Sequence, residues 1–286
     1  MPPSERQRLL LLPVYTLLVL GAIITMIPFA WLVCAAFKTN TDVFASNFLP
    51  VGDGFLGVAW HRLTMANFLR LFQELQIGRA LVNSIFLAST SALLATFSCA
   101  MAGYALAKFQ FAGRAWILAL VLAALVIPSS LLLAPGYKLL YQLGLLDTYA
   151  GLILPGITPA FGVFLFRQSM LNAVPMTLIE SARIDGAGEF RIFFTIVLPL
   201  VRPMIGAYLM ITFLAAWNNF IGPQIILQDP SRFPLSVMIN QLRGLYGTDY
   251  GLIMSGTLVS IAPVLIMFLL LQKEFIAGLT TGAVKE

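Results

Sequence analysis

Six long runs of this sequence contain no aspartate, glutamate, lysine, arginine or histidine, and they constrain the fold more than any other feature. They cover residues 9–37, 80–107, 115–137, 148–166, 203–228 and 250–272. About 20 predominantly apolar residues in a helix cross the hydrocarbon core of a bilayer. A membrane span must also satisfy its backbone hydrogen bonds, and only a helix does so within one segment. The sequence therefore predicts an all-α polytopic membrane protein with six transmembrane helices within residues 9–272. The shortest run needs help from its flanks.

The composition agrees with this interpretation, because 59% of the 286 residues are hydrophobic and only 10% are charged. A soluble domain carries about 25% charged residues, so most of this surface faces something other than water. The net charge of +5 suggests the bias of lysine and arginine toward cytoplasmic loops before it suggests nucleic acid. If residues 1–8 and 273–286 are cytoplasmic tails, ten of the 17 lysines and arginines lie inside. The sequence thus predicts cytoplasmic termini and no nucleic-acid partner.

One stretch between the fourth and fifth runs, residues 171–202, is polar and helical in pattern; we call it the elbow. Thr177 stands three residues before Glu180, which predicts a capping box that starts a helix. Gly186 is expected to end that helix, because glycine adopts the left-handed conformation without strain. A second helical run over 187–198 follows, and Pro199 is expected to mark its end. Five charges lie within residues 180–191: Glu180, Arg183, Asp185, Glu189 and Arg191. Such a segment must lie at the membrane surface, where a soluble protein can bind it.

The elbow resembles the EAA loop of binding-protein-dependent ABC importer permeases. The resemblance rests on Glu180, Ser181, Ala182, Gly186, Ile196, Leu198 and Pro199. The one departure is Ser181, where the family usually has alanine, and both residues are small enough for close packing. In that family the loop forms a coupling helix that docks into a cleft on a cytoplasmic ATPase subunit. The resemblance therefore implies that these residues, with Arg183 and Asp185, couple the chain to an ATPase.

The resemblance extends over nearly the whole chain. Segments similar to carbohydrate importer permeases of the maltose type are residues 37–40 (FKTN), 182–187 (ARIDGA), 217–220 (WNNF) and 278–285 (GLTTGAVK). It implies the second permease subunit of a heterodimer in a bacterial plasma (inner) membrane, in contact with lipid. The implied partners are a second permease subunit, two cytoplasmic ATPase subunits and an extracytoplasmic solute-binding protein. The implied solute is a sugar, an oligosaccharide or a glycerol phosphate-like compound. The chain needs no cofactor of its own, because the partner ATPase binds ATP.

Two polar pairs inside the apolar runs are candidates for a substrate pathway. Asn83 and Ser84 begin an unusually polar second run, whose small residues also suit close helix–helix packing. Asn218 and Asn219 follow Trp217 near the end of the fifth run, and buried amides need partners from protein, water or substrate. Interhelical hydrogen bonding and a pathway lining are both compatible with these residues.

Several kinds of chemistry have no signature in the sequence. A phosphate-binding P-loop needs lysine after glycine, and none of the five lysines follows one. Cys34 and Cys99 both fall in apolar runs, where they are expected to be packing residues rather than metal ligands. A membrane-embedded enzyme or an ion-coupled secondary transporter needs ionisable groups within the spans, and the six runs contain none. The sequence therefore predicts a permease that is not an enzyme and binds no metal. The alternatives are a secondary transporter and an ABC permease for a solute other than a sugar.

Overall fold

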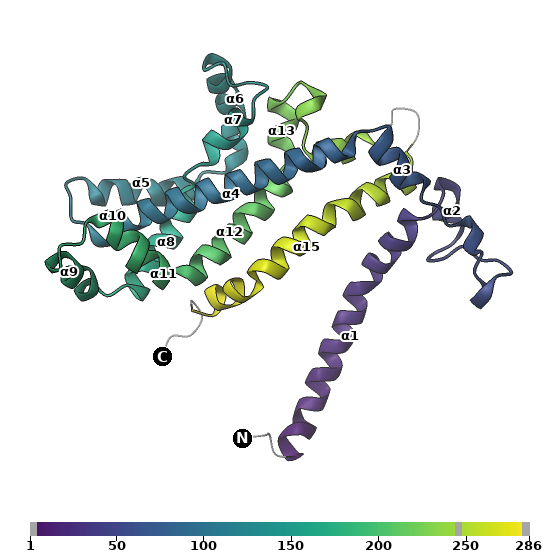
Figure 1. Cartoon of the computed structure of the whole chain (residues 1–286), viewed down its shortest axis with the longest axis horizontal. Helices are drawn as coiled ribbons and strands as arrows, with labels where there is room; N and C mark the ends of the chain where they lie inside the picture. Colours follow the sequence, from purple (N-terminus) through teal and green to yellow (C-terminus); the bar gives the residue numbers. More distant parts are fainter. Residues whose placement is uncertain (1–4, 244–247, 282–286) are drawn as a thin grey trace. The chain divides into compact units, whose positions relative to one another are not determined.

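The computed structural model describes residues 5–243 and 248–281, and within them the chain is helical, with two isolated β-bridges and no strand. The all-α prediction is therefore confirmed. The chain divides into two compact units, the first made of Met1–Ile77 and Ile239–Ile261 and the second of Gly78–Met238 and Ala262–Glu286. Figure 1 labels the helices along the chain.

Three helices are each long and apolar enough to cross a membrane without a break: α1 (Glu5–Ala36), α4 (Ile77–Lys108) and α15 (Tyr250–Thr281). Each has 32 residues, which is about 48 Å of helix at 1.5 Å per residue. They cover the first, second and sixth predicted runs. Their length exceeds the hydrocarbon core, so their ends reach the interface on both sides.

The third and fourth predicted runs are bent, and a third bent pair joins residues 189–200 to residues 202–217 at 81°. The helix α5 (Arg114–Val126) is followed by Ser129–Leu132 and α6 (Leu133–Gln142) at 99°, and α7 (Tyr149–Ile153) with Leu154–Gly156 is followed by α8 (Ala160–Ala173) at 43°. Pro128 and Pro159 lie at these breaks, since a proline donates no hydrogen bond and disfavours helix in the residue before it. If each bent pair is one span, the described residues contain six.

Two predicted boundaries differ from the structure. The third run was expected to end near Pro135, yet Pro135 lies in the first turn of α6, where a missing N–H costs nothing. The fifth run was expected to extend to residue 228. Its helix α12 (Arg202–Trp217) instead ends at Trp217, and a separate helix α13 (Ile221–Ile226) follows. Pattern alone missed these ends because apolar residues continue through the breaks.

The first unit ties the end of α1 to α3 (Ala66–Gln73) and to the start of α15. The carbonyl of Ala36 accepts hydrogen bonds from Asn67 Nδ2 at 3.0 Å and from Ser255 Oγ at 2.7 Å. Lys38 is fully buried just beyond the helix, and its ammonium donates to the carbonyl of Ser46 at 2.7 Å. The rest of α1 is exposed over residues 11–30. These contacts of Ala36 and Lys38, which we call the polar knot, fix one end of α1. The apolar side chains of residues 11–30 remain accessible to lipid or to another chain.

The second unit is built on α4, against which α8 and α12 pack closely. An added Cβ at Gly103 would lie 2.7 Å from the Phe166 Cβ, and one at Gly162 would lie 2.1 Å from the Tyr208 hydroxyl. Both glycines are therefore required for the close approach of the helices. Cys99 is buried in this core, 3.8 Å from the Tyr208 hydroxyl. It is a packing residue, as predicted.

Candidate functional site

The elbow begins where α8 ends. Its first arm is α9 (Met176–Ile184), which starts directly after Pro175 in an extended conformation with φ −63° and ψ 139°. The predicted capping box at Thr177 is wrong, because Thr177 already lies in the first turn of the helix. Its backbone carbonyl accepts a hydrogen bond from Ser181 Oγ at 3.0 Å. Proline at this position presets the chain for helix entry without a side-chain cap.

Gly186 ends α9 as predicted. It has φ +81°, and its N–H donates to the carbonyl of Arg183 at 3.0 Å. The N–H of Ala187 donates to the carbonyl of Ala182 at 2.9 Å. These two bonds form a Schellman motif, which satisfies carbonyls that the helix end leaves free. No neighbouring atom lies within 4 Å of an added Cβ, so the backbone conformation alone requires glycine here.

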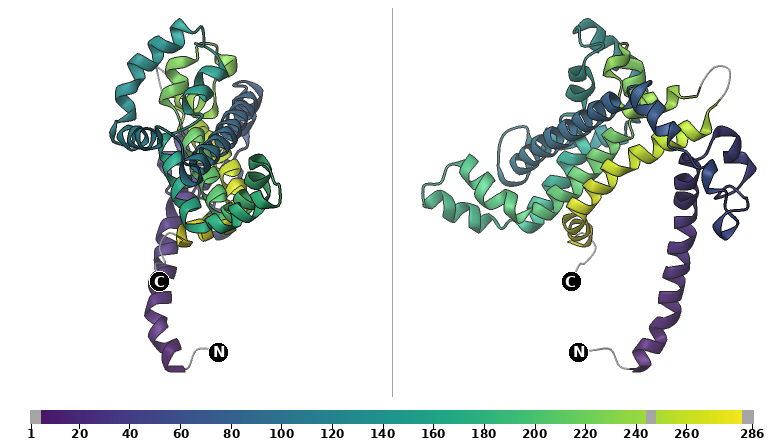
Figure 2. Two further views of the ribbon diagram at one scale, coloured as in Figure 1. Left: turned by 90° about the vertical axis from the view of Figure 1, so that its left-hand side faces the viewer. Right: turned by 45° about the vertical axis from the view of Figure 1, so that its right-hand side comes forward.

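The second arm is helical over 189–200, as α10 (Glu189–Ile192), a π-helical turn (Phe193–Val197) and α11 (Leu198–Leu200). The prediction that Pro199 marks the end of this run is wrong. Pro199 lies inside its last turn. Proline offers no N–H to the carbonyl of Thr195, and widening to a π turn accommodates that loss. The chain then bends by 81° into α12. Figures 1 and 2 show the elbow gathered beside the end of α4 that carries Lys108.

A polar clamp joins both arms of the elbow to α4; we use this name for Tyr104, Arg183 and Glu189. The Glu189 carboxylate accepts a hydrogen bond from Arg183 Nε at 2.6 Å and another from the Tyr104 hydroxyl at 3.0 Å. The Arg183 guanidinium also lies 5.6 Å from the centre of the Phe109 ring. The bond from Arg183 lowers the pKa of Glu189 below its usual value, aided by the Tyr104 hydroxyl. Arg183 therefore holds the elbow together rather than projecting from it.

The base of the elbow is fixed by basic side chains that bind free backbone carbonyls. Lys108 donates to the carbonyl of Val174, where α8 ends. Arg114 and Arg167 both donate to the carbonyl of Leu106, at 3.0 and 3.3 Å. Beneath these contacts Ile179, Ile192, Phe193 and Val197 are buried in the same core as Tyr104. Ile196 and Leu198 of the predicted motif pack against that core, half-buried. The elbow is therefore rigidly seated.

The opposite face of the elbow is bare. Glu180, Asp185 and Arg191 are exposed, and no described residue forms a hydrogen bond or ion pair with their side chains. Ile184 is 86% exposed. We call these four residues the outward face. Phe190 is also exposed, but it lines a groove with Tyr104 and Glu189 on the side of the clamp. Large apolar side chains bordered by charges are typical of a protein-binding surface. Of the remaining predicted residues, Ser181, Gly186 and Pro199 are exposed and Ala182 is half-buried.

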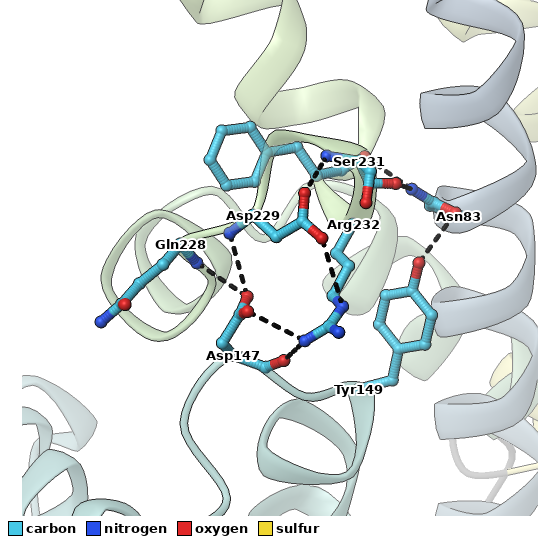
Figure 3. A network of polar contacts seen from close by, with 8 residues as sticks. Asn83, Asp147, Tyr149, Gln228, Asp229, Ser231 and Arg232 are labelled. Carbon is cyan, nitrogen blue, oxygen red and sulfur yellow. Dashed lines mark hydrogen bonds and ion pairs between the residues drawn. The ribbon is translucent and has the colours of Figure 1, made fainter.

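Two of the candidate pathway residues instead anchor a loop at the other end of α4. Asn83 Nδ2 donates to the carbonyls of Ser231 and Phe233 at 3.0 and 3.1 Å, and its Oδ1 accepts from the Tyr149 hydroxyl at 2.9 Å (Figure 3). Ser84 Oγ accepts from the N–H of Leu235 at 2.7 Å. Both side chains are buried and bind backbone groups, and the assignment of Asn83 and Ser84 to a pathway stays a prediction.

Asp147 organises the rest of this loop. It has φ +55°, and its Oδ1 accepts from the N–H groups of Gln228 and Asp229 at 2.9 and 3.0 Å (Figure 3). Its Oδ2 pairs with Arg232 Nη1 at 2.9 Å. The two backbone N–H groups are the main cause of a pKa of Asp147 below its ordinary value, and Arg232 adds to it. We call Asn83, Asp147, Tyr149, Asp229 and Arg232 the loop network.

We predict that acid weakens the loop network. Because the pKa of Asp147 is lowered in the folded chain, its contribution to stability is complete above the ordinary carboxyl value of about 4 and is lost as the pH falls through the lower folded value. The melting temperature of the wild-type chain should therefore fall more steeply between pH 5 and pH 3 than that of Asp147→Asn. Asp53→Asn serves as the control, because Asp53 is exposed and no hydrogen bond to its side chain is described. Equal slopes for wild type and Asp147→Asn would contradict this role.

The second candidate pair, Asn218 and Asn219, caps the end of α12. The buried Trp217 ring stacks on Phe213, with centres 5.7 Å apart. Asn218 Nδ2 donates to the carbonyl of Leu214 at 2.9 Å, and Asn219 Oδ1 accepts from the N–H of Gly222 at 3.2 Å. Both asparagines remain exposed. Their amides bind local backbone, and the assignment of Trp217, Asn218 and Asn219 to a pathway stays a prediction.

The clamp and the loop network lie near opposite ends of α4. Asn83 and Tyr104 are 21 residues apart on one helix, which is about 32 Å at 1.5 Å per residue. The hydrocarbon core of a bilayer is about 30 Å thick. The two polar clusters are therefore separated by about one membrane thickness, which is the arrangement that a membrane-spanning subunit requires. Sequence reasoning missed Tyr104, and only its contact with Glu189 marks it.

Comparisons with known proteins agree with this arrangement. Residues 99–273 match the family described as "Binding-protein-dependent transport system inner membrane component". The chain is 36% identical over 265 residues to the arabinooligosaccharides transport system permease protein AraQ of Halalkalibacterium halodurans, covering 92% of each protein. It is 30% identical to the lactose transport system permease protein LacG of Rhizobium radiobacter over the full length of both.

Solved structures show the same fold. A chain of a bacterial ABC transporter involved in the import of the acidic polysaccharide alginate superposes with a TM-score of 0.77 at 19% identity, covering 96% of this chain and 99% of that one. The resemblance of the chain to binding-protein-dependent importer permeases is thereby confirmed, and so is the prediction of a membrane protein. The chain belongs to the family of inner membrane components of binding-protein-dependent transport systems.

Proposed function

We propose that this chain is the transmembrane permease subunit of an ATP-driven importer for a carbohydrate, in the class of sugars, oligosaccharides and glycerol phosphate-like solutes. The observation that carries the proposal is the elbow, because it is seated rigidly on α4 and leaves its outward face bare. The solute class is supported by the names of the relatives, which include permeases for arabinooligosaccharides and lactose. The chain itself is not an enzyme, and a separate ATPase subunit binds ATP.

The proposed assembly has one copy of this chain, a second permease subunit, two cytoplasmic ATPase subunits and an extracytoplasmic solute-binding protein. A solved relative of the fold is a bacterial alginate ABC transporter in complex with a pentasaccharide-bound periplasmic protein. Both termini and the elbow lie in the cytoplasm in this arrangement. The positive charges of Lys108 and Arg114, close to the elbow, support that orientation. The six spans then form the membrane domain over residues 9–272.

The proposed mechanism is alternating access driven from the elbow. The ATPase docks on the outward face, where Ile184 supplies apolar contact and Glu180, Asp185 and Arg191 fix the register. Closure of the paired ATPases moves the elbow as a rigid body. The clamp passes this motion to α4, because Glu189 links α9 and α10 to Tyr104. The spans then exchange inward for outward access around the solute.

Reconstituted transport tests the proposal. The chain is co-expressed with the candidate second permease and ATPase, purified, and placed in proteoliposomes with the binding protein outside. We expect uptake of radiolabelled oligosaccharide that requires internal ATP and binding protein. Uptake that continues without ATP under a proton gradient would indicate a secondary transporter. Uptake of a non-sugar solute alone would refute the carbohydrate assignment, and failure to retain an ATPase would remove the whole proposal.

A conservative substitution tests the clamp. Tyr104→Phe removes the hydroxyl that donates to Glu189, and a hydrogen bond to a charged group contributes about 1.5–3 kcal/mol. We expect normal assembly and ATP hydrolysis, but a severalfold fall in solute transported per ATP hydrolysed. The matched control is Tyr208→Phe in the same core, whose hydroxyl has its one described hydrogen bond with the neutral Cys99 thiol, at 3.8 Å. An unchanged transport-to-hydrolysis ratio in Tyr104→Phe would exclude a role in transmission.

A further inference from the structure

The loop after α1 exposes a run of apolar side chains. We call residues 46–60 the finger. Val51, Phe55 and Leu56 are 78%, 77% and 80% exposed, and Phe48 and Trp60 are also exposed. Asp53 is the one charged residue in this segment. Soluble surfaces rarely gather so many apolar side chains in one place unless they meet a membrane or a partner.

The finger contacts α1 through Phe48. Phe48 lines an apolar groove with Met26, Ile27 and Ala30 of that helix, and Figures 1 and 2 show residues 40–62 beside its Ala36 end. Ala30 and Met26 precede Ala36 by 6 and 10 residues, or about 9 and 15 Å along the helix. If the Ala36 end of α1 lies at the membrane surface, Phe48 lies deeper in the bilayer than that end of the helix.

Several backbone polar groups of the finger form hydrogen bonds within the finger itself. The N–H of Ala59 donates to the carbonyl of Pro50 at 2.8 Å, and that of Gly52 donates to Gly57 at 3.0 Å. Val51 and Val58 form an antiparallel bridge. Trp60 Nε1 donates to the carbonyl of Phe55 at 3.0 Å. Local pairing of this kind lowers the cost of bringing a loop into the membrane interface.

The tip also holds an apolar residue where glycine would fit the backbone better. Leu56 has φ +61° and is followed by Gly57 at φ +72°. A left-handed conformation is unfavourable for residues that carry a Cβ. Strained positions of this kind cluster where a surface has a function. The sequence thus presents a leucine at the most exposed point of the finger despite the backbone cost.

We infer that the finger is a membrane-interface anchor, which inserts its apolar side chains among the lipids at the Ala36 end of α1. Lipid is the occupant that the observations favour, because the finger continues the apolar face of a membrane-spanning helix. Tryptophan and other aromatic residues also prefer the level of the lipid headgroups. The anchor would fix the height and tilt of α1, since the polar knot at Ala36 and Lys38 joins the finger to that helix.

Spin-label accessibility in the complete transporter tests this inference. Leu56→Cys and the control Gln73→Cys are made in a chain carrying Cys34→Ala and Cys99→Ala. Gln73 is exposed and polar and belongs to the same unit. After labelling and reconstitution in phosphatidylcholine–phosphatidylglycerol nanodiscs, collisions with oxygen and with a water-soluble nickel chelate are measured. We expect the oxygen-to-nickel ratio to be severalfold higher at residue 56 than at residue 73.

The other outcomes overturn the inference in identifiable ways. Equal ratios at both positions would place the finger in water. Exclusion of both reagents at residue 56 would show that the second permease covers it, and exclusion only after the binding protein is added would show that this protein does. Quenching of Trp60 by brominated lipid, measured as the difference between the native chain and Trp60→Phe, gives a second reading without cysteine replacement. No quenchable Trp60 emission would likewise refute the anchor.

Discussion

Replacing Gly186 with proline is expected to abolish solute uptake while leaving the amount of chain in the membrane unchanged. Gly186 has φ +81°, whereas proline is fixed near −65° and has no N–H to donate to the carbonyl of Arg183. The Schellman turn cannot form, and the loss amounts to at least about 3 kcal/mol in a helical element. The two arms of the elbow then no longer meet at the clamp. The measurement is ATP-dependent uptake, normalised to chain quantified in purified membranes.

Substitutions of Gly186 that differ in how well they tolerate the left-handed conformation test whether the turn itself is required. Gly186→Asn should keep much of the uptake, because asparagine tolerates the left-handed conformation better than other side chains. Gly186→Val should fall near the proline variant. Gly188→Ala is the matched control, since Gly188 has φ −71° and open space around an added Cβ. Equal uptake in Gly186→Pro and wild type would show that the turn is not needed for coupling.

Reversing the charge of Glu180 is expected to release the ATPase. Glu180 is exposed on the outward face and forms no described hydrogen bond or ion pair within the chain, so Glu180→Lys should insert and fold normally. Disrupting a charge contact at the centre of an interface costs about 2–5 kcal/mol. The lower value corresponds to a loss of about 30-fold in affinity. We expect the ATPase subunits to be lost on purification and uptake to fall to background.

A charge reversal elsewhere provides the comparison. Glu74 on the other unit is exposed, and its contact with Arg70 at 3.7 Å is a surface pair of little value. Glu74→Lys should keep the ATPase and the uptake of the wild type. A compensating arginine-to-glutamate change on the ATPase should restore binding to Glu180→Lys. Retention of ATPase and uptake in Glu180→Lys would remove the outward face as the docking surface.

Local patterns in the sequence predicted the features that depend on a few consecutive residues. Three of the six charge-free runs form long unbroken helices, and the third and fourth runs form bent pairs. Gly186 ends its helix as expected, because the conformation required there excludes other residues on grounds of local sterics. Prolines were harder to interpret. Pro128 and Pro159 break helices, whereas Pro135 and Pro199 lie within helical turns, since the effect of a missing N–H depends on whether its acceptor has another partner.

The roles of polar side chains were not predictable in the same way. Tyr104 and Glu189 are 85 residues apart, and Asn83 meets Ser231 and Phe233 across about 150 residues. Nothing in the neighbourhood of Tyr104 or Asn83 in the sequence identifies these partners. Arg183 shows the same limit, because its charge predicted an exposed contact, while packing directs it inward to Glu189 and Phe109.

By itself the sequence determined that this chain is helical, that it is a membrane protein, and that a charged helical segment lies between two of its apolar runs. Those properties follow from transfer of apolar side chains out of water and from backbone hydrogen bonding within each segment, and both are local. The tertiary structure decided which charges face outward and which close the clamp, where the helices bend, and that the loop network lies about a membrane thickness from the elbow. These outcomes depend on which helices touch, and contact between distant segments is set by close packing around residues such as Gly103 and Gly162, which no local pattern specifies.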